Sequence, residues 1–177
     1  VTFPVGAAAA GTRALCAACI EALDAAIANM WPGARLSEIS AAVEGYARAR
    51  GFSVVKRFVG HGIGTELHEA PHVPNYVDEE VLRNDLLLRP GMVLAVEPML
   101  NEGAEEVVEL GDRWTVVTAD RKLSAHFEHT VAVGPDGPEI LTPWHETIDT
   151  GLFSGKIGLF MNRGRLTSHA EGRADSS

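Results

Sequence analysis

Two acidic residues stand in runs of otherwise apolar, strand-forming sequence. Glu97 follows the run 93–96, and Glu128 lies inside the run 125–133. A buried carboxylate is tolerated only when a cation, a hydrogen-bond network or a proton compensates its charge. A third segment places His61 between two glycines and His68 seven residues later. These residue types indicate that the compensating cation is a metal ion, so the fold has to bring three distant segments together.

Strand alternation places Glu97 as the lone charge on a small-residue face, together with Val93 and Ala95, because alternate residues of a strand share a face. Space would then remain in front of the carboxylate for a ligand. A glutamate at the strand end that reaches solvent beside Pro98 explains the same pattern. This segment alone leaves the two interpretations open.

Glu128 is more constrained, because a carboxylate in the middle of a strand is usually paired. The alternative to a metal is an ion pair with a basic residue such as Arg57 or Lys122. His126 shares the predicted strand face of Glu128. We expect His126 to support the site as a hydrogen-bond donor rather than as a ligand.

Length and composition are those of a soluble globular domain. Of the 177 residues, 46% are hydrophobic and 22% are charged, which are ordinary fractions. No segment approaches the roughly 18 apolar residues of a membrane span. The net charge of −9 argues against nucleic-acid binding, which relies on clustered Lys and Arg. We therefore expect a cytoplasmic protein with neither a membrane nor a nucleic acid as partner.

Cys16 and Cys19 form a C-x-x-C pattern that invites a redox or zinc interpretation. Residues at i and i+3 share a helix face, and the surrounding sequence has helical periodicity. Two small apolar core residues therefore explain the pair better.

The order of the predicted elements, helices first and strands afterwards, indicates an α+β domain. Apolar spacing predicts helices over 8–30 and 36–50. Strands are predicted over 52–59, 92–100, 114–118, 125–133 and 139–141, with a loop over 70–91. Residues 154–177 are predicted to form a disordered tail behind a domain of residues 1–153.

Three segments, in the right order, resemble the signatures of type I methionine aminopeptidases. The first is the glycine-framed His61 with the continuation over 67–76, the second is 88–92 leading to 96–99, and the third is 114–118 leading to 124–130. The resemblance covers about residues 1–143 and implies the pita-bread α+β fold, with helices packed on a mainly antiparallel curved sheet. The proline-directed peptidases have the same metal architecture but resemble the third segment less.

The resemblance implies that His61, Glu97 and Glu128 are metal ligands, with Glu128 bridging two divalent ions. The ions would be Co, Mn, Fe or Zn, which the sequence does not distinguish. The implied reaction is removal of N-terminal methionine from peptides or nascent chains by hydroxide attack on the scissile carbonyl. Glu97 would also carry the proton.

The resemblance also implies residues that contact the substrate. His68 would contact the scissile peptide and stabilise the developing oxyanion, and Leu67 and Trp114 would lie near the pocket for the methionine side chain. The resemblance further implies that the intact protein is a monomer.

The family's two remaining metal ligands are aspartates N-terminal to the first helix. Residues 2–6 resemble the segment that follows them, and no aspartate precedes Asp24. We therefore expect the C-terminal portion of such an enzyme, which binds at most one divalent ion tightly and cleaves Met-peptides poorly. A non-catalytic pita-bread binding module and a proline-directed metallopeptidase are the alternatives.

Overall fold

The computed structural model describes residues 1–144. Two antiparallel-packed helices, α1 (Ala10–Ile27) and α2 (Leu36–Ala49), begin the domain. Both present one apolar stripe to the core, as the helical periodicity predicted. The backbone N–H of Arg35 donates to the Glu38 carboxylate (3.1 Å) and thereby begins α2.

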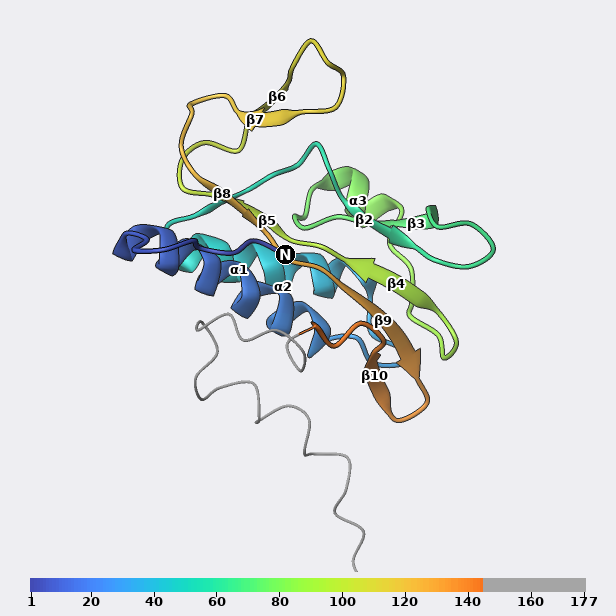
Figure 1. Cartoon of the computed structure of the whole chain (residues 1–177). Helices are drawn as coiled ribbons and strands as arrows, with labels where there is room; N and C mark the ends of the chain where they lie inside the picture. The colour runs from blue at the N-terminus through green and yellow to red at the C-terminus, as the bar shows by residue number, and fades with distance from the viewer. Residues whose placement is uncertain (145–177) are drawn as a thin grey trace, which may run out of the picture.

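The strands form three antiparallel sheets (Figure 1). The five-stranded sheet has the order β10-β9-β4-β2-β3, the three-stranded sheet the order β1-β5-β8, and β6 pairs with β7 alone. The bounds are β1 Ser53–Val54, β2 Gly60–Gly62, β3 Glu69–Val73, β4 Val93–Val96, β5 Met99–Asn101, β6 Val107–Glu109, β7 Val116–Thr118, β8 Ser124–His126, β9 His129–Gly134 and β10 Gly137–Ile140. Helices followed by antiparallel strands confirm the predicted α+β class.

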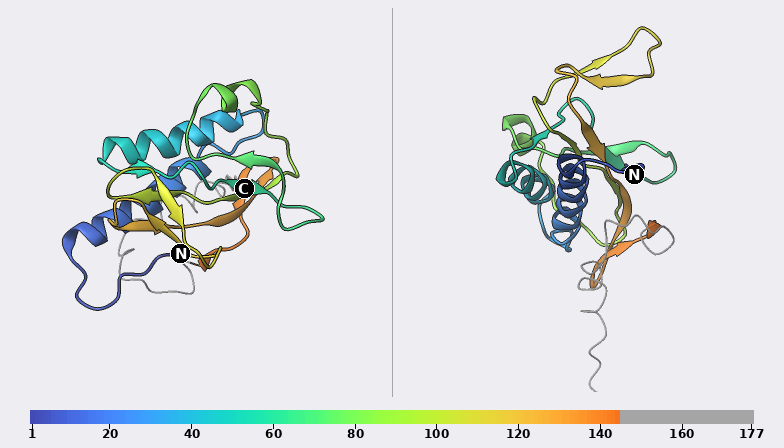
Figure 2. Two further views of the ribbon diagram at one scale, coloured as in Figure 1. Left: turned by 90° about the horizontal axis from the view of Figure 1, so that it is seen from above. Right: turned by 60° about the vertical axis from the view of Figure 1, so that its left-hand side comes forward.

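Both helices cover the same face of the sheets, and the β6–β7 hairpin projects away from that layer (Figure 2). Leu94 and Val131 are paired in the β4–β9 register and are buried against the helices. Their neighbours Ala95 and Thr130, also paired, face the other side. His61 pairs with Ala95 in β2–β4 and so lies on that second face, away from the helices.

Neither of the two long predicted strands is continuous. Residues 92–100 divide into β4 and β5 at Glu97 and Pro98, and residues 125–133 divide into β8 and β9 at Phe127 and Glu128. At each break the chain passes between the five-stranded and the three-stranded sheet. The Phe127 amide bonds to the Pro98 carbonyl (3.3 Å), which holds the two breaks side by side. Proline contributes to the interruption because it has no N–H to donate to a ladder.

Other predicted bounds need correction. The segment 70–91, predicted as a loop, contains most of β3 and a short helix, α3 (Glu79–Arg83). Asp78 begins α3 by accepting the backbone N–H groups of Glu80 and Val81. The predicted strand 52–59 is reduced to β1, and β6 forms in a segment for which no strand was predicted.

Pairing partners explain these differences, because β2 gains hydrogen bonds from the distant β4, while β3 and β6 each pair with one strand across a loop. Local propensity does not record these pairings. The predicted tail, 154–177, lies outside the described residues. Within residues 1–144, none of the helices has the length and apolar character that crossing a membrane requires.

Candidate metal centre

Glu97 and Glu128 lie together on the face of the sheet that the helices leave open, one at each strand break. His61 Nε2 is 3.5 Å from Glu97 Oε1, and His126 Nε2 is 3.5 Å from Glu97 Oε2. The potential ligand atoms of Glu97, His126 and Glu128 all lie within 4.8 Å of one another. Of the predicted ligands, the structure therefore brings Glu97 and Glu128 together, while His61 approaches the opposite oxygen of Glu97, outside that group.

The orientation of His61 follows from its position in β2, in the interior of the five-stranded sheet. A Cβ on Gly60 would overlap with the Ala95 carbonyl oxygen, and one on Gly62 would overlap with the Ala70 carbonyl oxygen. Only glycine allows the neighbouring strands to come this close. His61 Nδ1 lies 2.9 Å from the Gly62 carbonyl, which can only accept. Nδ1 therefore carries a proton, and Nε2 faces Glu97; in the neutral ring this nitrogen presents its lone pair there.

The break that carries Glu97 is held by neighbouring side chains. The Asn75 amide, which is buried, donates to the Glu97 carbonyl at 3.1 Å. The Cys19 thiol contacts the Pro98 carbonyl at 3.2 Å and the Ala125 carbonyl at 3.4 Å, and so joins α1 to both breaks. Burial raises the pKa of Cys19 to about 12. A thiol that is neutral and fully buried confirms the structural interpretation of the C-x-x-C pattern.

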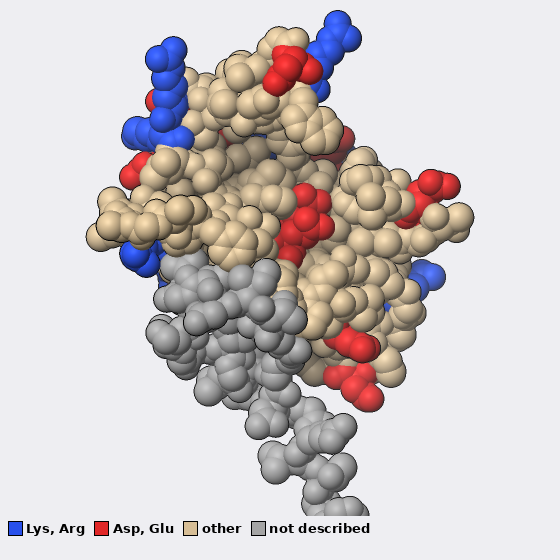
Figure 3. Space-filling model, in the orientation of Figure 1, with Lys and Arg blue, Asp and Glu red and all other residues tan. Residues whose placement is uncertain are grey.

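No Lys or Arg compensates these carboxylates within residues 1–144. Arg57, one of the alternative partners of Glu128, pairs with Glu109 at 2.9 Å instead, and Lys122 forms no ion pair with Glu128. Figure 3 shows acidic atoms near the middle of this face, with most of the basic side chains toward its edges. Glu97 is only 15% exposed, so its charge needs compensation, which the neighbouring histidines or a bound cation would supply.

The residues present fit a divalent metal ion. In the neutral imidazole, the lone pair of His61 faces a carboxylate, and a cation between the two groups removes the repulsion. Ligands at 2.0–2.2 Å from a tetrahedral ion are separated from each other by roughly 3.3–3.6 Å. The 3.5 Å between His61 Nε2 and Glu97 Oε1 falls within that range. Imidazole and carboxylate are also the ligand types that zinc and related transition metals take.

The predicted substrate-contacting residues lie in exposed positions. His68 is next to His61, with ring centroids 4.2 Å apart, so it borders the centre. Leu67, in the same loop, is 68% exposed, and Trp114, at the β6–β7 hairpin, is 88% exposed. The structure thus places His68 beside the centre and leaves Leu67 and Trp114 at the surface. Their roles in substrate binding stay predictions.

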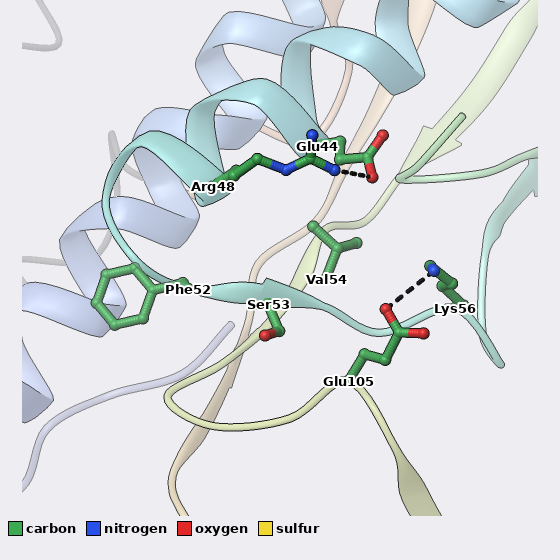
Figure 4. Close-up of a pocket in the computed structure, with 7 residues that line it drawn as sticks. All are labelled: Glu44, Arg48, Phe52, Ser53, Val54, Lys56 and Glu105. Carbon is green, nitrogen blue, oxygen red and sulfur yellow. Dashed lines mark hydrogen bonds and ion pairs between the residues drawn. The ribbon is translucent and has the colours of Figure 1, made fainter. Parts of the chain in front are cut away.

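A separate pocket of about 180 Å³ lies between α2, β1 and the segment that holds Glu105 (Figure 4). Its charged groups are already paired, with Arg48 2.9 Å from Glu44 and Lys56 2.9 Å from Glu105. Paired charges leave no unsatisfied group that would bind a ligand, so the metal centre is the stronger candidate.

Comparison with known proteins agrees with this geometry. Residues 1–135 match the model of Metallopeptidase family M24. Methionine aminopeptidase B of Synechocystis is 52% identical over 141 residues, which are 80% of this chain and 50% of the relative. The chain spans about half the length of the curated relatives it matches.

Solved structures show the same fold. Methionine aminopeptidase from Thermotoga maritima superposes with a TM-score of 0.76 and 42% identity, over 80% of this chain and 56% of that chain. The Xaa-Pro dipeptidase from Bacillus anthracis has a TM-score of 0.60 and 23% identity, over 80% of this chain and 33% of that chain. The expected pita-bread fold is therefore confirmed, and the proline-directed alternative is the less favoured one. A matched family model over most of the described residues and an open-face cluster of His and Glu show that this chain belongs to the metallopeptidases of family M24.

Proposed function

We propose that the protein removes the N-terminal methionine from peptides and nascent chains by metal-dependent hydrolysis. The observation that carries the proposal is the meeting of Glu97 and Glu128 at two strand breaks, beside His61 and without a Lys or Arg partner in residues 1–144. Similarity to proteins named methionine aminopeptidase supports the choice of substrate.

His61, Glu97 and Glu128 would hold the metal. When bound, divalent ions supply a hydroxide nucleophile at neutral pH and polarise the scissile carbonyl. The two carboxylate oxygens of Glu97 face different imidazoles, those of His61 and His126, each at 3.5 Å. This position allows its carboxylate to accept the proton of the attacking water and to return it to the leaving amine.

His68 would orient the substrate. Its ring lies against that of His61, and it is exposed on the loop between β2 and β3. His68 is therefore within reach of a peptide that binds over the open face of the sheet. From this position the imidazole can donate a hydrogen bond to a scissile carbonyl oxygen as negative charge develops there. Leu67 and Trp114 would contact the methionine side chain.

The experiment combines metal titration with substrate comparison. We expect calorimetric titration of the 177-residue chain with Co²⁺, Mn²⁺ or Zn²⁺, after chelation, to show one tight site that Glu128→Gln removes. Glu139→Gln makes the same change at an exposed position on β10, and its affinity should match wild type. The metal-loaded chain should cleave Met-Ala-Ser in preference to Xaa-Pro peptides.

Unchanged affinity in Glu128→Gln would show that this carboxylate is structural and would contradict the proposal. Faster cleavage of Xaa-Pro peptides would instead identify the protein as a proline-directed peptidase. Metal binding without peptide cleavage, even at high protein concentration, would favour the non-catalytic binding module.

A further inference from the structure

The side chain of His126 is 41% exposed, but its inner ring nitrogen is left unsatisfied. Its Nε2 is buried and has no hydrogen-bond partner within residues 1–144. The closest charged atom to it is Glu97 Oε2 at 3.5 Å. Buried polar nitrogen atoms almost always have a partner, so this one indicates a group that binds at this position.

The backbone holds His126 firmly in this orientation. On one side, His126 is paired with Met99 in the β5–β8 register. On the other, its N–H donates to the Thr2 hydroxyl at 2.9 Å, and the same hydroxyl donates to the His126 carbonyl at 3.1 Å. The Thr2 hydroxyl thus satisfies both backbone groups of His126 at this edge of β8. The imidazole is presented from a fixed backbone, just before the chain reaches Phe127 and Glu128.

The separation between the imidazole and the carboxylate is that of two ligands of one ion. An N–H···O hydrogen bond is typically 2.7–3.2 Å long, and 3.5 Å is beyond that range. Two ligands of a tetrahedral ion at 2.0–2.2 Å are roughly 3.3–3.6 Å apart. One ligand atom of Glu128 lies within 4.8 Å of a ligand atom in each of the other two residues, which allows the same ion to reach all three residues after small side-chain rotations.

We propose that His126 is a metal ligand in this chain and that it holds a divalent cation together with Glu97 and Glu128. This inference rests on the proposed metal-dependent function and adds a ligand to it. Glu97 lies between the two histidines, because its Oε1 faces Nε2 of His61 and its Oε2 faces Nε2 of His126.

Ring-nitrogen spectra of the chain with ¹⁵N-labelled histidine distinguish a ligand from a neighbouring donor. On titration with Zn²⁺, we expect the His126 Nε2 resonance to move to a metal-bound position while Nδ1 remains protonated. The His126→Gln variant identifies the resonance. An Nε2 signal of His126 that keeps its position while Zn²⁺ binds would overturn the inference and leave the metal-dependent function intact.

Calorimetry with Zn²⁺ gives a second, independent readout. Loss of an outer-shell partner lowers metal affinity by about 10–100-fold, so His126→Gln should lower it by more than about 100-fold. Glu139→Gln, at the exposed position on β10, is the control, and its affinity should equal that of wild type. Unfolding of the chelated variants in urea checks that the fold is retained.

The possible failures can be told apart. If wild type binds Zn²⁺ and His126→Gln binds it equally well, only the role of His126 is wrong. If wild type binds no Zn²⁺, the proposed function fails together with this inference. If His126→Gln does not fold, through-bond correlations to the backbone of wild type assign the His126 resonance instead, and the ring-nitrogen spectra still decide.

Discussion

Replacement of Asp24 by asparagine should stabilise this protein at neutral pH and lose most of that effect in mild acid. Asp24 lies on the partly buried face of α1. Burial, and then repulsion by Glu21, raises the pKa of Asp24 from 3.8 to about 6. Glu21 is fixed nearby because it pairs with Arg50 at 3.2 Å and accepts a hydrogen bond from the Tyr46 hydroxyl. The folded protein thus holds a carboxylate in a place that disfavours its charge.

The sign and the size of the effect of Asp24 on stability follow from proton linkage. Between pH 3.8 and about 6 the folded state binds more protons at Asp24 than the unfolded state, so stability falls as pH rises through this window. A pKa difference of about two units between the folded and the unfolded state corresponds to about 3 kcal/mol of lost stability when the carboxylate is fully shielded from solvent. Since Asp24 retains some solvent contact, screening reduces the expected cost of its charge to about 1–2 kcal/mol above pH 7. Asparagine carries no charge, so Asp24→Asn should recover this amount.

Urea unfolding in the presence of a chelator, at pH 7.5 and pH 4.5, measures the effect without a contribution from bound metal. At pH 4.5 the advantage of Asp24→Asn should fall to about a third of its value at pH 7.5. Asp136→Asn makes the same substitution in an exposed turn between β9 and β10 and should change little at either pH. An advantage of equal size at both pH values, or a destabilised Asp24→Asn, would refute the reasoning.

Two further substitutions test the framework of the metal centre. Gly60→Ala should cost about 1–3 kcal/mol in urea unfolding, because the new Cβ overlaps with the Ala95 carbonyl oxygen across β2–β4. Gly45→Ala is the control, because Gly45 is an interior position of α2 with open space around it, and it should stabilise the protein by up to about 1 kcal/mol. If Gly60→Ala costs no more stability than Gly45→Ala changes, the close contact between β2 and β4 does not require glycine. Phe127→Ala should cost about 3–5 kcal/mol, because this fully buried ring precedes Glu128. Calorimetry of the folded variant should also show weaker Zn²⁺ binding, and wild-type affinity would mean that Phe127 does not position the carboxylate.

Much of the domain can be predicted from the sequence because the relevant signals are local. The apolar spacing of α1 and α2 is a repeat within single segments, and it predicted both helices to within a few residues. The mismatch of Glu97 and Glu128 with their apolar surroundings is also local. It singled out the two carboxylates that the structure brings together.

The strand bounds could not be predicted in the same way. β2 is a three-residue strand that contains two glycines, and it exists because β3 and β4 supply its hydrogen bonds. The long predicted strands looked continuous because both halves are apolar. The chain changes sheet at Pro98 and at Phe127 because the two breaks contact each other. This contact cannot be predicted from the sequence of either segment alone.

The sequence by itself determined the residue types that bear the chemistry, and it did so because a charge in an apolar run is costly wherever the run lies. Tertiary structure alone decided which of them meet. It placed His126 against Glu97 although alternation could only assign it a strand face, and it left Trp114 and Leu67 exposed. The physical reason is that the directions of side chains at a strand break are set by pairing with distant segments, such as Thr2 and Met99 at β8, and not by the sequence around the break.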